Sequence, residues 1–175
     1  MWQKPIIQYN ACIMQTEILT SGEPGLGTAA AFFRIGLMAR VCTPDEARAW
    51  ALSIIAASDD PPGEIIEVSW RKPLNVLLVD LSRVEGVVDN VVAGHWLLAR
   101  VAELPAVSDD EIWDRLQQAM QISREAGLHE LFDDFNGLDD VFNLAVSGVC
   151  GDVASCREEL LSILATFSKA PFNFR

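Results

Sequence analysis

Apolar residues recur every three or four positions along most of the chain, which is the period of an amphipathic α-helix. Residues 26–41 combine small side chains, which allow close packing, with bulky ones such as Phe32 and Phe33. Leucines and valines follow the same period in residues 74–85, 87–104 and 153–168. The pattern predicts a helix in each of these stretches, with Gly86 ending the second and Pro105 following the third.

Two helix starts are marked by capping residues. In residues 43–46, Thr43 is placed as N-cap, with Pro44 next and Glu46 three residues after the cap, which is the pattern of a capping box. Residues 108–111 repeat the pattern with Ser108 and Glu111, and Val107 is placed to pack against Ile112. The second helix is expected to end at Gly127, because glycine adopts the left-handed cap without strain.

The stretch 131–142 packs four aspartates around an Asn-Gly pair. If Gly137 took the sixth position of a calcium-binding loop, Phe132 and Asn143 would occupy the first and last ligand positions, where carboxylates are needed. We therefore expect Asn136-Gly137 to end one short helix, and Asp139 and Asp140 to lie in the first turn of the next. The glycines of residues 22–30 likewise match nucleotide-binding loops in spacing only.

The fold expected from these patterns is all-α: a single domain over residues 1–175 with six to eight short helices. A minor β element is an alternative in residues 5–19 or in residues 64–70, because a short apolar run has no decisive period. The tail 169–175 is expected to fray. No apolar run is long enough for a membrane span and no signal peptide is evident, so the chain is expected in the cytoplasm.

The four cysteines lack the paired spacing of a zinc site or a disulfide scaffold, and most are expected to be core residues. The five tryptophans are spread along the chain and are expected to be core anchors, with at least one exposed. No serine lies in a G-x-S-x-G elbow. These patterns favour a protein that is not an enzyme.

Negative charge is concentrated in one segment. Residues 103–140 hold 11 acids and 2 bases, a net charge of −9, whereas residues 1–102 have a net charge of −3 and residues 141–175 a net charge of 0. Phosphates would be repelled by this acid-rich segment, so no nucleic-acid or anionic-membrane partner is expected there. The simplest interpretation is a solvated face that aids solubility. The more specific one is a docking face for a basic protein.

A metal site is the main alternative to protein binding. His129 lies near Glu125, Glu130, Asp133 and Asp134 in the sequence, but the chain has only one Glu-x-x-x-His element, and Gly127 interrupts it. A di-iron bundle needs paired Glu-x-x-His elements on two helices. His95 lies mid-helix, where a buried, hydrogen-bonded histidine is more common than a ligand. We expect neither metal nor cofactor.

The sequence thus favours a non-enzymatic protein-binding domain, an immunity-type or adaptor protein that docks a basic partner through an acidic face. Two alternatives stay open: a metal-binding protein or enzyme that uses His129 and nearby carboxylates, and a structural subunit of a homo-oligomer. The residues expected to bind the partner are Asp110, Asp114, Glu130, Asp133, Asp134, Asp139 and Asp140.

Overall fold

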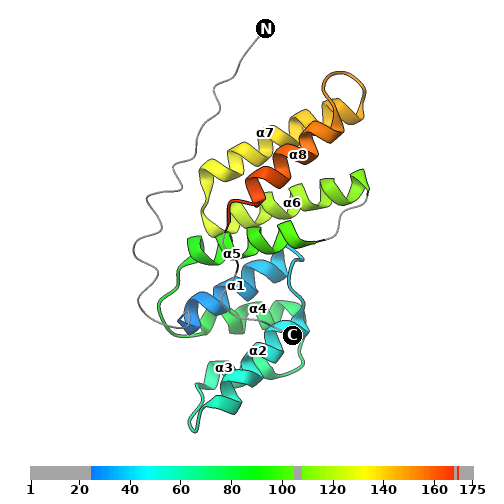
Figure 1. Ribbon diagram of the computed structural model, residues 1–175. Helices are drawn as coiled ribbons and strands as arrows, with labels where there is room; N and C mark the ends of the chain where they lie inside the picture. Colours follow the sequence, from blue (N-terminus) through cyan, green and yellow to red (C-terminus); the bar gives the residue numbers. More distant parts are fainter. Residues whose placement is uncertain (1–24, 105–107, 168, 170–175) are drawn as a thin grey trace.

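The computed structural model describes residues 25–104, 108–167 and 169, and this part of the chain contains eight α-helices and no strand (Figure 1). The all-α prediction is therefore confirmed for the described residues. The helices are α1 (Leu26–Met38), α2 (Pro44–Ala57), α3 (Gly63–Ser69), α4 (Leu74–Arg83), α5 (Asn90–Glu103), α6 (Asp109–Ala126), α7 (His129–Val146) and α8 (Val153–Leu164).

The helices form a stack in which each layer contacts the next. Figure 1 shows α7 and α8 at one end, followed by α6, α5, α1 and α4, with α2 and α3 at the other end. Contacts between α6 and α7, α5 and α6, α1 and α5, α1 and α4, and α3 and α4 connect these layers, and α2 packs on α3. A single hydrophobic core runs from α1 to α8.

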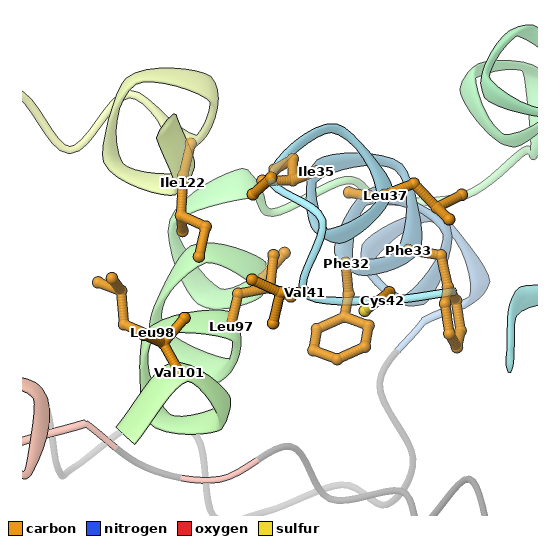
Figure 2. Close-up of a cluster of buried hydrophobic side chains, with 14 of the residues drawn as sticks. Phe32, Phe33, Ile35, Leu37, Val41, Cys42, Leu97, Leu98, Val101 and Ile122 are labelled. Atoms are coloured by element: carbon orange, nitrogen blue, oxygen red, sulfur yellow. The ribbon is translucent and has the colours of Figure 1, made fainter. Parts of the chain in front are cut away.

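Helix α1 lies inside the stack and is buried along most of its length. Figure 2 shows Phe32 and Ile35 of this helix on the side that faces α5, which carries Leu97, with Ile122 of α6 close by. Phe32 and Phe33 also meet edge to face, with ring centroids 5.2 Å apart. Because α1 is covered on opposite sides by α4 and α5, its sequence has few polar positions.

Close backbone approach depends on glycines at two contacts. A β-carbon on Gly27 would lie 2.7 Å from the carbonyl oxygen of Val87, so α1 begins directly against the segment that leads into α5. A β-carbon on Gly94 would lie 2.5 Å from the β-carbon of Ala126, so α5 and α6 meet with almost no space between them. Both contacts exclude any larger residue without movement of a helix.

Both predicted capping boxes are confirmed. The backbone N–H of Thr43 donates to the Glu46 carboxylate at 2.8 Å, and the N–H of Glu46 donates back to the Thr43 hydroxyl. Ser108 and Glu111 make the same pair of bonds at the start of α6. Gly127 ends α6 in the left-handed conformation, as expected. The predicted contact of Val107 lies outside the described residues.

Residues 64–69 belong to α3 and Trp70 follows as its C-cap, so the β alternative for residues 64–70 is wrong. Ile65 and Val68 of α3 are fully buried, and their three-residue spacing suits one face of a helix that packs on α2 and α4. The other suggested β element, in residues 5–19, lies outside the described residues, as do Cys12 and all of the predicted frayed tail except Lys169.

The expected break at Asn136-Gly137 is wrong, because α7 is one continuous helix from His129 to Val146. Asp139 and Asp140 therefore lie inside a helix and not in its first turn. The residues Phe135, Leu138 and Phe142 are buried on one face across the Asn-Gly pair. Burying three large apolar side chains stabilises the helix by several times the ~1 kcal/mol that a glycine costs within it.

Smaller differences concern the helix ends. Helix α1 ends at Met38, three residues before the sequence-based boundary, and α4 ends at Arg83, two residues before it. Helix α5 begins at Asn90 with Asp89 as its N-cap. The Thr28 hydroxyl explains part of this difference. It donates to the carbonyl oxygen of Val87 and accepts the backbone N–H of Asp89, which holds this segment extended against α1.

Two glycine substitutions test this packing. Gly94→Ala is expected to lower the free energy of unfolding by about 2 kcal/mol, because the new methyl group would overlap Ala126. Gly137→Ala is the matched control, since its added β-carbon would meet no atom within 4 Å beyond its chain neighbours and the backbone of its own helix. It is expected to raise stability by up to about 1 kcal/mol, because alanine favours a continuous helix. Urea unfolding measures both changes, and a loss of stability from Gly137→Ala would contradict the continuous α7.

Candidate functional site

The predicted partner-binding residues lie on two neighbouring helices. Asp110 and Asp114 are exposed on α6, and Glu130, Asp133, Asp134 and Asp140 are exposed on α7, which packs against α6 (Figure 1). We call these six residues the acidic surface. Their spacing places Asp133 and Asp140 two turns apart on one side of α7, and Glu130 and Asp134 one turn apart on another. The carboxylates thus cover the outside of the two helices and do not converge on one point.

Asp139 differs from the other six residues. It is half-buried, and its carboxylate accepts hydrogen bonds from Gln117 Nε2 of α6 at 2.9 Å and from Asn143 Nδ2 at 3.3 Å. The first bond links α6 to α7 across their contact. Asp139 therefore has a structural role between the helices, and its role in partner binding stays a prediction.

The structure does not bring the residues of the metal alternative together at one point. His129 is the exposed first residue of α7. Within the described ranges, no three His, Cys, Asp or Glu side chains lie close enough together to hold a metal ion. The stretch 131–142 is helical throughout, so it provides no loop that could wrap around a calcium ion.

Tryptophans 70 and 113 are exposed, whereas Trp50 is buried and Trp96 half-buried. Trp113 keeps 41% of its surface exposed on α6, where it lies between Asp110 and Asp114 in the sequence. An exposed tryptophan leaves a large apolar area in water, which binding to a partner would remove. The even spacing of the tryptophans along the chain did not indicate which of them would be exposed.

A hollow of about 210 Å³ opens beside α6 and is lined by Leu104, Glu111, Asp114, Arg115 and Gln118. Arg115 is only 5% exposed, yet its Nε has no hydrogen-bond partner. The side-chain oxygen of Gln118 is likewise buried without a partner. The sequence pattern did not indicate either residue as buried. Arg115 follows Glu111 by four positions, which ordinarily indicates an exposed ion pair.

A second hollow of about 340 Å³ lies between α3 and α4 and is lined by Gly63, Glu64, Glu67, Asp80 and Arg83. Two of its three acids, Glu67 and Asp80, are already paired within the chain. Lys72 donates to Asp80 at 2.6 Å and to Glu67 at 3.2 Å, and Arg83 lies 3.8 Å from Asp80. These ion pairs join α3 to α4, so the hollow has a structural role.

Burial changes the pKa of two further groups, the Cys42 thiol and the His95 imidazole. Desolvation raises the pKa of the Cys42 thiol to about 12, which makes it unreactive at neutral pH. Cys156 is also buried, as predicted for most cysteines, but Cys150 is exposed. None of Cys42, Cys150 and Cys156 forms a disulfide.

His95 of α5 stacks on Phe167, with ring centroids 5.2 Å apart. Burial lowers the pKa of His95, and the negative charge of Asp89 opposes this shift.

Comparison with known proteins identifies no relative: no family model matches the chain, and no curated protein or solved structure shows significant similarity to it. No helix within the described ranges has the length and apolar character needed to span a bilayer. The function must therefore be inferred from the chemistry of the surfaces described above.

The lowered pKa of His95 predicts a pH dependence of stability. Because His95 resists protonation in the folded state, the unfolded chain takes up this proton first as the pH falls below about 6.5. Stability from this group is therefore complete above that pH and is lost as the pH falls through the folded pKa. His95→Phe keeps a stacked ring without the titration, and is expected to flatten the decrease in unfolding free energy between pH 7 and 5.

Urea unfolding at a series of pH values measures this slope. His129→Gln is the control, because it removes a histidine that is exposed. An unchanged slope in His95→Phe would contradict the assignment.

Proposed function

We propose that this protein is a non-enzymatic binding domain of the immunity or adaptor type, which docks a basic protein through the acidic surface on α6 and α7. The proposal combines a local excess of negative charge with exposed carboxylates on adjacent helices. Complementary charge accelerates association with a basic partner and repels nucleic acid.

One observation favours docking over simple solubility. Trp113 is exposed within one helical turn of Asp110 and Asp114, and in the described part of the chain neither carboxylate is in an ion pair. A face that served only for solubility would gain nothing from an exposed tryptophan, whereas interface hot spots are enriched in this residue. An aromatic anchor with acids on either side suits a basic partner that also presents an apolar patch.

The proposal includes a cytoplasmic location. Cys42, Cys150 and Cys156 are free thiols, and Cys150 is exposed. Exposed free thiols are typical of reducing compartments. The partner would be encountered in the same compartment.

Affinity capture from lysate of the source cells tests the docking surface. Wild-type protein is expected to retain one basic protein at low salt and to lose much of it at high salt. Asp110→Asn/Asp114→Asn is expected to reduce the affinity about tenfold and to weaken its salt dependence, because two unpaired charges are removed. Trp113→Ala is expected to reduce the affinity by a similar factor or more, with less effect on the salt dependence.

Asp59→Asn/Asp60→Asn is the matched control, since it removes the same charge from exposed residues of the segment between α2 and α3. It is expected to bind like wild type. Equal binding by all three variants, or no basic protein retained by the wild type, would reject the proposal.

Self-association is a second candidate because large apolar side chains are exposed on α4 and in the segment after it. Val76 and Val79 are exposed on α4, and Val87 and Val88 are exposed in the segment that joins α4 to α5, with Val87 82% exposed. A homo-oligomer would remove such side chains from water. This candidate does not involve the acidic surface.

Light scattering tests self-association. If this candidate is right, the wild type is a dimer or larger oligomer, and Val76→Ser/Val79→Ser shifts the protein toward monomer because less apolar area is buried at the interface. A wild type that stays monomeric at the highest concentration reached would discard this candidate.

A further inference from the structure

Large apolar side chains are exposed where α7 ends and the chain turns toward α8. Leu144 is 45% exposed and Val146 61% exposed in the last turn of α7, and Val149 is 70% exposed in the loop that follows. We call these three residues the apolar end. Figure 1 shows this loop projecting at the upper right of the molecule. Exposed apolar side chains that lie together mark sites where a protein binds a partner.

Backbone hydrogen bonds hold the apolar end in place. The N–H of Val149 donates to the carbonyl oxygen of Leu144 at 3.0 Å, and Gly148 adopts the left-handed conformation with a φ of 68°. These are the bond and the glycine of a Schellman motif, in which the apolar residue after the glycine packs on one in the last turn of the helix. The exposure of Val149 and Leu144 therefore belongs to an ordered helix end.

The apolar end continues the acidic surface along α7. Leu144 follows Asp140 by four residues, so the two side chains lie one turn apart on the same side of the helix. Asp140 belongs to the acidic surface and is exposed. A partner that covers Asp140 would therefore also meet Leu144.

Trp113 of α6 lies toward the same end of the molecule. Only two residues separate α6 from α7, so the two helices run antiparallel. The hydrogen bond from Gln117 to Asp139 shows which residues lie opposite each other. Trp113 is one turn before Gln117, and Val146 is two turns after Asp139, so both lie on the same side of that bond. Trp113 thus adds its exposed ring to the apolar side chains at this end.

The charges around this region are negative. Asp110 and Asp114 lie on either side of Trp113 in the sequence, and Asp152 follows the loop as the N-cap of α8. Residues 125–156 contain no lysine or arginine. A second copy of the chain that met this region with its own would bring carboxylates against carboxylates, since such an interface joins identical surfaces. The charge therefore favours a basic partner over self-association here.

We propose that the apolar end and Trp113 form the hydrophobic centre of the docking interface, which receives apolar side chains of the partner that are flanked by lysine or arginine. Those cations would pair with Asp110, Asp114 and Asp140 at the rim. The inference rests on the proposed function, because that function defines the partner as a basic protein. It adds selection for an apolar patch, whereas the acidic surface selects only for charge.

The experiment uses the blocked peptide acetyl-Lys-Leu-Leu-Lys-Lys-Leu-Leu-Lys-amide as the probe. It is titrated into the full-length protein labelled at its leucine and valine methyl groups and followed by NMR. The methyl signals of Leu144, Val146 and Val149 are expected to shift and saturate. Two comparison peptides, one with serine for each leucine and one with glutamate for each lysine, are expected to bind at least about tenfold more weakly.

Three results would overturn the proposal. Equal binding of the serine peptide would show that only charge is recognised, and equal binding of the glutamate peptide would show that charge is not recognised at this end. The third result is no shift of these methyl signals with the lysine-leucine peptide. Signals that shift when the protein alone is concentrated would assign the apolar end to a second copy, which also contradicts the proposal.

Val146→Ser/Val149→Ser is the decisive variant. It should weaken peptide binding at least about tenfold and leave the unfolding midpoint close to that of wild type, because both side chains are already exposed in the folded protein. Val76→Ser/Val79→Ser is the matched control, since it makes the same change to exposed valines of α4, several layers away (Figure 1). The control is expected to bind the peptide like wild type. Unchanged peptide binding by Val146→Ser/Val149→Ser would reject the inference.

Capture of the partner separates this inference from the proposed function. If Asp110→Asn/Asp114→Asn loses the partner but Val146→Ser/Val149→Ser captures it like wild type, the docking surface is right and the inference about the apolar end is wrong. If the peptide binds the apolar end but none of these variants, nor Trp113→Ala, changes capture, the proposed docking is wrong although the apolar end recognises a basic, apolar sequence.

Discussion

The burial of α1 on opposite sides is the constraint on which the rest of the structure depends. A helix covered by α4 on one side and α5 on the other has little room for long side chains where backbones approach. Gly27 meets this requirement against Val87, and the Thr28 hydroxyl then joins α1 to the start of α5 with two hydrogen bonds. Since α5 in turn packs closely on α6 through Gly94, the position of the acid-rich helices follows from the packing of α1.

Carboxylates of the acid-rich segment differ in what they do. Glu111 caps its own helix, and Asp139 links α6 to α7 through Gln117. Asp110 and Asp114 make no ion pair with the described residues, and they are the ones close to Trp113 in sequence. Net charge counts all of these acids equally. In the proposed docking, only the exposed, unpaired carboxylates would contribute substantially to binding, because the others already accept hydrogen bonds within the chain.

Elements with strong local signals were predicted well. The capping boxes at Thr43 and Ser108 and the glycine cap at Gly127 lie where the sequence placed them, because these interactions join residues within one turn. The helix end predicted at Asn136-Gly137 was wrong because that prediction also used only neighbouring residues. It is locally a good helix end, but the burial of Phe135, Leu138 and Phe142 outweighs that preference.

The sequence by itself therefore determined the helical class, most helix starts and the location of the charge, since each depends on neighbours along the chain. Tertiary structure alone decided that Trp113 is exposed, that Asp139 bonds to α6, and that Arg115 is buried. Helical spacing gives the face on which a residue lies. What covers that face depends on packing between segments far apart in the chain, and this packing is not encoded in any short stretch of sequence.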